Sequence, residues 1–240
     1  MTTTTYPEQL LLPGQAAAPE GPVDMFMMYL MHHAFRRDLR RFASAVPHTP
    51  VDDRATWTAL ADRWGRFADV LHKHHSGEDA GLWPFLLQRA DDDERVVLLA
   101  MEAEHDKIDP QLKSCAHLLA ELARESRDRD RLRAQLSVRL AETRELLDHH
   151  LRHEESEAMA ILQRHTTQEE WDRLEEEFFG ETKKDLRALL YVCNWIAEDL
   201  APAVVDGVFA KAGQAFRVVM WLGRRRFRRL EQQAFRYLPA

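Results

Sequence analysis

Two short stretches of this sequence share a pattern in which a histidine is followed four residues later by a glutamate. His74 precedes Glu78 by four residues, and His150 precedes Glu154 by the same interval. On an α-helix, residues four apart lie on one face, so each pair directs an imidazole and a carboxylate towards one point. Two such pairs that face each other, helped by other histidines, make a site for two metal ions.

The composition favours a helical protein. Apolar residues make up 45% of the 240 residues, enough to fill a core, and only 9 are glycine. A net charge of −7 suits a soluble chain and argues against general affinity for nucleic acid. The two cysteines, Cys115 and Cys193, provide no disulfide framework, so we expect a cytoplasmic location. The apolar run at 200–210 is short and contains Pro202 and Asp206, so no membrane span is expected.

Apolar residues recur at helical spacing through four long segments. We predict helices over about 24–46, 53–89, 93–125 and 129–164, with kinks at Pro84 and Pro110. Short connections between long amphipathic helices favour an up-down-up-down four-helix bundle, which places His105 and His150 at one level. The fold class is therefore all-α. We assign residues 1–21 to a disordered segment, 22–165 to the bundle, and 166–240 to a helical C-terminal extension that packs on the bundle or on another subunit.

Each predicted bundle helix carries at least one histidine. The candidate metal ligands are His33 (with His32 as the alternative), His74, Glu78, His105, His150 and Glu154. Imidazole and carboxylate ligands suit iron, manganese or zinc and exclude thiolate sites. Glu102, three residues before His105, is a further candidate ligand. His75 and His153 are near enough to act as donors beside the site or as alternative ligands, and Tyr29 could reach it.

Four stretches of the chain resemble hemerythrin-like domains of the HHE cation-binding family. They are HAFRRDL from His33, HHSGEDAGLWP from His74, EHDKI from Glu104 and HLRHEE from His150, and the resemblance covers roughly residues 24–165. It implies two non-heme irons joined by an oxo or hydroxo bridge. His33, His74, His105 and His150 are then terminal ligands, and Glu78 and Glu154 are bridges.

Two positions depart from the oxygen-carrying members of that family. Their third helix supplies two histidines four residues apart, whereas here Met101 stands four residues before His105. The carboxylate of the fourth helix is also a Glu at a spacing of four, Glu154, in place of an Asp at five. The missing histidine predicts an open metal position filled by water, a Tyr or Glu side chain, or a small ligand. Such a position favours reaction with oxygen, peroxide or nitric oxide, or sensing of iron.

These observations lead to one main functional hypothesis. We expect a di-iron protein that binds or reacts with dioxygen or a related small oxidant. A peroxide-consuming enzyme is one alternative, and an iron or oxygen sensor that acts through a partner is another. The weakest is a bundle that holds zinc or no metal. Nucleic-acid and membrane partners are not expected, and a homo-oligomer would form through the C-terminal helices.

Overall fold

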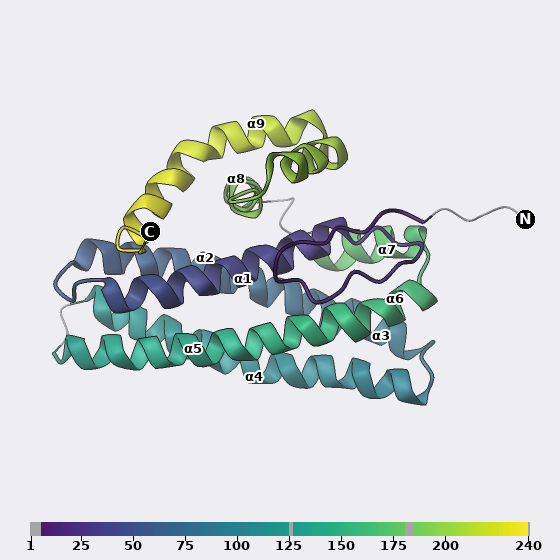
Figure 1. Cartoon of the computed structure of the whole chain (residues 1–240), viewed down its shortest axis with the longest axis horizontal. Coiled ribbons are helices and arrows are strands. Elements are labelled where there is room, and N and C mark those ends of the chain that lie inside the picture. The colour runs from purple at the N-terminus through teal and green to yellow at the C-terminus, as the bar shows by residue number, and fades with distance from the viewer. Residues whose placement is uncertain (1–5, 125–126, 181–184, 240) are drawn as a thin grey trace, which may run out of the picture.

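Helices account for the architecture in the computed structural model of the chain, which describes residues 6–124, 127–180 and 185–239. No strand occurs within those ranges, and the all-α prediction is confirmed. Figure 1 shows four long antiparallel arms beneath a smaller group of C-terminal helices. The arms are α1 (Phe26–His48); α2 (Arg54–Gly77), η1 (Glu78–Leu82) and α3 (Trp83–Leu87); α4 (Asp92–Ala123); and α5 (Arg129–His153), η2 (Glu154–Ala158) and α6 (Met159–His165).

The arms form the predicted up-down-up-down bundle. α2 packs against α4, α4 against α5, and α5 against α1. The third arm begins with a capping box, in which Asp91 accepts from the Glu94 amide and the Glu94 side chain accepts from the Asp91 amide. It then runs through Pro110 as one helix, with Leu112 and Cys115 still buried beyond the proline.

Two arms contain a π-helical turn, and each turn begins at the glutamate of a His-Glu pair. η1 starts at Glu78 and η2 starts at Glu154. In the second arm Pro84 follows, and its missing N–H leaves the carbonyl group of Ala80 without the usual helical donor. The fourth arm makes the same turn with Ala160 at the corresponding position. Proline is therefore not the shared cause of these turns, which coincide instead with the two polar pairs. Such turns occur frequently at functional sites.

The buried apolar residues form two clusters, one on each side of the polar pairs. In the second arm, Leu71 belongs to the first cluster and Leu82 to the second. Along the fourth arm, Leu151 and Ala158 are divided in the same way. The polar residues between them therefore lie in a section of the bundle closed by apolar side chains at both ends.

Residues 166–239 build a helical extension on the bundle, as far as the described residues go. It consists of α7 (Gln168–Leu174), η3 (Glu175–Phe179), α8 (Leu186–Ile196) and α9 (Pro202–Ala234). A capping box formed by Thr167 and Glu170 begins α7. α9 changes direction at Gly213, whose φ of 77° favours glycine. Among the described helices, none has the length and apolar character that crossing a bilayer requires.

A buried group of charges joins the extension to the bundle. Asp38 of α1 lies 2.6 Å from the Arg63 guanidinium of α2, and neither side chain is exposed. Arg63 also pairs with Glu231 of α9. From α8, the Trp195 indole donates to Asp38 over 2.7 Å. These contacts link residues up to 168 positions apart in the sequence.

The N-terminal segment follows a defined path along the bundle from residue 6. Its contacts follow no helical or strand spacing. The Gln15 side-chain amide donates to the Leu10 carbonyl, and the Gln15 side-chain oxygen accepts from the Leu12 backbone amide. Further on, Val23 exchanges two hydrogen bonds with Gln163. The sequence led us to expect disorder over 1–21. Residues 1–5 lie outside the described residues, while 6–21 are held by these irregular contacts.

The buried charges give a stability prediction. Arg63→Met removes the fully buried cation that Asp38 and Glu231 share and leaves Asp38 with Arg37 and Glu231 with Arg41. We expect a loss of about 3 kcal/mol in unfolding free energy, at the lower end for a broken buried pair. Arg139→Met removes an exposed pair with Glu142 and should cost less than about 1 kcal/mol. Urea unfolding followed by circular dichroism measures both. An equal, small loss in the two variants would show that the network does not hold the extension.

Candidate metal centre

Seven buried side chains from all four arms converge in two adjoining groups. One group contains His32, His74, Glu78 and Glu154, and the other contains His75, His105 and His150. Within each group, the nitrogen or oxygen atoms that could bind a metal lie within 4.8 Å of one another. Each group is therefore a candidate site for one cation.

The two glutamates reach both groups. Glu78 places Oε1 3.1 Å from the Nε2 atom of His74 and Oε2 3.6 Å from that of His105. The Oε2 atom of Glu154 lies 3.3 Å from His32 and 3.6 Å from His150, again at Nε2. A carboxylate shared in this way can bridge two metal ions, as in the dinuclear sites of other four-helix bundles.

Acidic neighbours orient three of the imidazoles. The Nδ1 atom of His105 lies 2.7 Å from Asp79, and that of His150 lies 2.9 Å from Glu104. On α1, the Nδ1 atom of His32 lies 3.0 Å from Glu155. A carboxylate at Nδ1 favours the tautomer with its proton there, which leaves the inward-facing Nε2 free to bind metal.

Unpaired polar atoms test whether these residues fit a cation. Both oxygens of Glu78 and of Glu154, and both ring nitrogens of His75, are buried without a hydrogen-bond partner among the described residues. Burial, and then the charge of Glu154, raise the pKa of Glu78 well above its usual value. Burial and the neighbouring histidines lower the pKa of His74 and His75, which keeps both imidazoles neutral. Buried polar groups left in this state are costly, and metal ions would satisfy the four glutamate oxygens and one nitrogen of His75.

Glu104 and Glu155 supply negative charge next to the candidate ligands His150 and His32. Burial alone would raise the pKa of Glu104, but hydrogen bonds from His150 and His153 lower it to about 2. Hydrogen bonding and charge from His32, followed by Arg36, lower the pKa of Glu155 to about 2 against the same effect of burial. Both carboxylates are therefore ionised at neutral pH.

On the first helix the structure places His32, and not His33, in the site. His33 lies one residue further round α1, half-buried near the backbone of Pro13. Burial, followed by Arg37 and Arg40, lowers its pKa. We therefore take His32 as the candidate ligand in place of the predicted His33. The phase of the helix carried this signal: His32 lies on the stripe defined by the buried residues Met28, Phe35, Leu39 and Phe42.

His75 is the residue that the sequence analysis missed as a primary candidate. Its ring stacks on that of His105, with centroids 3.9 Å apart. It supplies a fifth histidine, whereas Met101, at the place of the missing one, is buried in apolar surroundings. The open coordination position inferred from Met101 is therefore not in the group formed by His75, His105 and His150. His75 follows Leu71 by four residues on the core-facing stripe of α2, which was its sequence signal. Glu102 is exposed on α4 and lies outside both groups.

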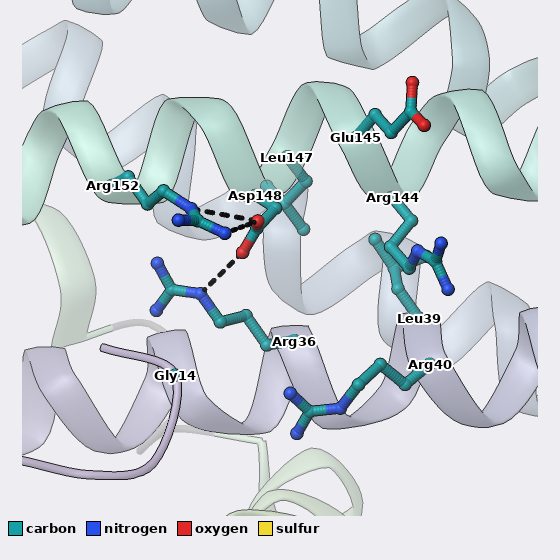
Figure 2. A pocket seen from close by; sticks show the side chains of 9 residues that line it. All are labelled: Gly14, Arg36, Leu39, Arg40, Arg144, Glu145, Leu147, Asp148 and Arg152. Atoms are coloured by element: carbon teal, nitrogen blue, oxygen red, sulfur yellow. Dashed lines mark hydrogen bonds and ion pairs between the residues drawn. The ribbon is translucent and has the colours of Figure 1, made fainter. Parts of the chain in front are cut away.

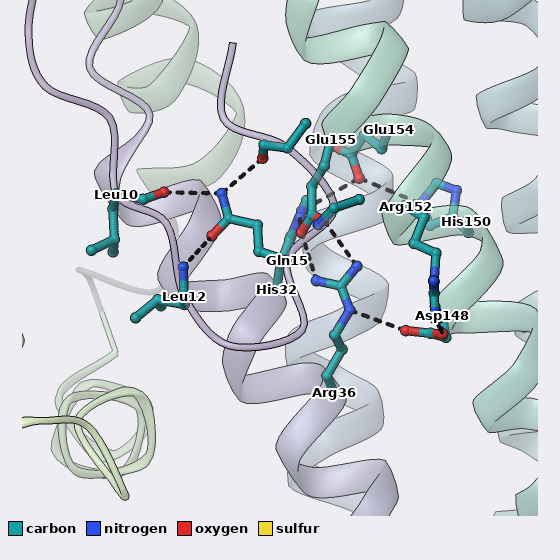
Figure 3. Close-up of polar contacts among 12 residues, drawn as sticks. Leu10, Leu12, Gln15, His32, Arg36, Asp148, His150, Arg152, Glu154 and Glu155 are labelled. Carbon is teal, nitrogen blue, oxygen red and sulfur yellow. Dashed lines mark hydrogen bonds and ion pairs between the residues drawn. The ribbon is translucent and has the colours of Figure 1, made fainter. Parts of the chain in front are cut away.

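Glu155 also fixes the N-terminal segment beside the site. Its carboxylate receives the Arg36 guanidinium at 2.6 and 3.0 Å and the Ala16 amide at 2.7 Å. Figure 3 shows these contacts converging next to His32 and Glu154. Three separate donors thus hold in place the carboxylate that orients His32.

Two aromatic side chains of the extension cover the π-helical turn η1. A Cβ atom at Gly77 would lie 2.6 Å from the Phe179 ring, and one at Gly81 would lie 2.3 Å from the Phe178 ring. Phe179 also lies against His74, with ring centroids 6.3 Å apart. The two glycines therefore permit the close approach of apolar rings that shield this side of the site from water.

An all-α bundle with five histidines and two glutamates gathered at its centre has the side chains of a cation-binding protein. The model of the hemerythrin HHE cation-binding domain matches residues 25–170. The chain therefore belongs to this family, and its bundle is a hemerythrin-like cation-binding domain. Comparison with curated proteins gave no match, and comparison with solved structures gave none either.

The adjacent histidines of α1 make a matched test of the ligand assignment. His32→Ala removes a nitrogen from the group with His74, so we expect the chain to lose one bound metal ion. His33→Ala should retain both. Elemental analysis of protein purified after metal-replete expression measures the metal content per chain. Loss of metal in His33→Ala with full content in His32→Ala would reverse the assignment.

Glu78→Gln should have opposite effects on the metal-free and metal-loaded proteins. Without metal at neutral pH, the variant removes a buried carboxylate with a raised pKa, so we expect a gain of about 1–3 kcal/mol in unfolding free energy. With metal, it removes a bridge, and the stabilisation by metal should fall.

The pH dependence gives this prediction a sign. Because the folded-state pKa is raised, the cost of the carboxylate is absent below its ordinary pKa of 4.5 and grows as pH rises above it. The difference between Glu78→Gln and wild type should therefore vanish in acid. Exposed Glu102→Gln is the matched control and should change neither state. Denaturant unfolding at two pH values measures this; a metal-free variant less stable than wild type at pH 7 would contradict it.

Proposed function

We propose that this chain is a non-heme di-iron protein whose centre binds or reacts with dioxygen or a related small oxidant, such as peroxide or nitric oxide. The observation that carries the proposal is the pair of buried glutamates, each within reach of both histidine groups. Five imidazoles and two carboxylates form a ligand set that suits iron and does not suit soft metals, which prefer sulfur ligands. Manganese and zinc also bind to these nitrogen and oxygen atoms. When bound, two irons would supply one-electron and oxygen chemistry. A cytoplasmic location remains part of this proposal.

The division of histidines indicates where an oxidant would bind. One group has three histidines, whereas the group with His32 and His74 has two. If Glu78 and Glu154 are shared by both ions, the ion held by His32 and His74 has fewer protein ligands. An open coordination position is therefore expected on the α1 side of the site. The apolar residues on both sides and Phe178 and Phe179 exclude bulk water from it.

Tyr29 favours the alternative of a peroxide-consuming enzyme. It lies one helical turn before His32, is fully buried, and its hydroxyl has no hydrogen-bond partner in the described structure. Burial, then the charges of Glu155 and Glu154, raise the pKa of Tyr29, so the phenol stays protonated. A phenol that stays protonated beside the site can donate a hydrogen bond to a bound oxidant, which is the contact that the enzyme alternative requires.

A ring contact favours the second alternative, a sensor. Phe35 lies between His74 and Trp195 of α8, with centroids 5.3 Å from the imidazole and 5.5 Å from the indole. A movement of His74 when metal binds would therefore be transmitted through Phe35 to Trp195 in the extension. In that case the extension would become harder for a protease to cleave when iron is bound.

Metal content and optical spectra test the main proposal. We expect two irons per chain, one for each group, and near-ultraviolet absorption bands that change between nitrogen and air. Protein that contains no iron after iron-replete expression, or spectra that are identical under both gases, would exclude it. Exposed Glu102→Gln provides the control for surface binding of iron.

Peroxide consumption separates the enzyme from the oxygen-binding protein. If Tyr29 supplies a proton, Tyr29→Phe should slow peroxide loss by about 10²-fold or more while the iron content stays the same. Equal rates in wild type and Tyr29→Phe would argue against this role for the phenol. For the sensor, iron-dependent protection of 165–240 is the expected result, and equal digestion with and without iron would contradict it.

A further inference from the structure

A pocket between α1 and α5 is lined with arginines and lies outside the metal centre. Its volume is about 350 Å³, within the range of small-molecule sites. Figure 2 shows side chains from both helices, with Gly14 of the N-terminal segment at the edge. The lining residues are Gly14, Arg36, Leu39, Arg40, Arg144, Glu145, Leu147, Asp148 and Arg152.

At one end of this pocket the charges are balanced. Asp148 lies 3.2 Å from the Arg36 guanidinium and 2.6 Å from that of Arg152. Arg36 directs its other nitrogens to Glu155. The polar groups at this end therefore already have partners within the chain.

One helical turn away the balance is broken. Arg40 follows Arg36 by four residues on α1, and Arg144 precedes Asp148 by four on α5. Both arginines line the pocket, yet neither makes an ion pair within the described residues. Glu145 is the nearest acidic lining residue, and in Figure 2 its carboxylate points away from both arginines. Two like charges therefore line one pocket, and no acidic side chain among the described residues pairs with either of them.

The rest of the lining sets the kind of molecule that fits. Leu39 and Leu147 are buried beneath the arginines and give the pocket an apolar floor. Guanidinium groups bind carboxylate and phosphate oxygens through paired, charge-assisted hydrogen bonds. An apolar floor with such a rim fits a small organic anion better than a bare inorganic ion.

We propose that this pocket binds a small organic anion, through a phosphate or carboxylate group held by Arg40 and Arg144 and an apolar part resting on Leu39 and Leu147. The site is separate from the di-metal centre but connected to it. Arg36, at the balanced end, holds Glu155, and Glu155 orients the candidate ligand His32. The proposal does not depend on the identity of the metal or on the reaction.

Calorimetric titration of the metal-loaded full chain at low ionic strength tests the proposal. The probes are phenyl phosphate and benzoate, which separate the two anionic groups, and benzyl alcohol, which keeps the ring without the charge. We expect saturable one-to-one binding of at least one anion and none of the alcohol. The double variant Arg40→Gln/Arg144→Gln should weaken binding by about ten-fold or more, the equivalent of one lost charge-assisted interaction.

A charge-matched variant removes the simplest alternative explanation. Arg131 of α5 and Arg225 of α9 are exposed, make no ion pair within the described residues and lie outside the pocket. Arg131→Gln/Arg225→Gln lowers the net charge by the same amount and should leave binding within about two-fold of wild type. All four side chains are exposed, so circular dichroism should show intact folding in both variants. Equal weakening in the two variants, or no saturable binding of either anion up to about 10 mM, would overturn the proposal.

Discussion

Two carboxylates buried next to each other are the constraint on which the centre of this protein depends. Glu78 and Glu154 are fully buried, and their oxygens have no hydrogen-bond partners in the described structure. Two buried carboxylates that are both ionised repel each other unless a cation lies nearby. In the metal-free bundle, the ionised form of at least one carboxyl group is therefore destabilised. Burial lowers the pKa of His74, His75 and His150, so these three imidazoles stay neutral and do not supply a compensating positive charge at neutral pH. Metal binding is thus the most direct way for this sequence to become stable in this fold.

The apolar clusters and the acidic partners make that constraint specific. Apolar side chains close the site at both ends, and Phe178 and Phe179 cover η1. Around this dry section, Asp79, Glu104 and Glu155 fix the imidazoles of three helices. Because these acids contact Nδ1 and leave Nε2 facing inward, the geometry is set before any ion arrives. A site organised in this way selects a metal ion by the type and spacing of its ligands. These three imidazoles do not have to move for the ion to bind.

The sequence predicts the bundle and most of the centre because both depend on helical period. The spacing of His74 and Glu78 places them on one face, and antiparallel register brings His105 within 3.1 Å of His150. Choosing between His32 and His33 requires the phase of α1, which the apolar residues of that helix give and the motif HAFRRDL does not. His75 was missed as a primary candidate because its neighbour His74 already forms the four-residue pair with Glu78, although His75 lies on the core-facing stripe of α2. The contact of Arg63 with Glu231 joins residues 168 positions apart, and no local pattern predicts it.

The π-helical turns have a consequence for how this protein can change. A turn closed by hydrogen bonds five residues apart accommodates about one residue more than an α-helical turn, so η1 and η2 each act as a one-residue insertion. Deleting a residue from either turn would restore a regular helix and keep the residues beyond it on the same faces, because the turn already absorbs the extra residue. Deleting a residue from the α-helical part of either arm just before the turn would instead rotate everything beyond it by about 100°, and Leu82 and Leu86, or Met159 and Leu162, would leave the core. Length variation within these two arms is therefore tolerable at the π-helical turns, beside the metal centre.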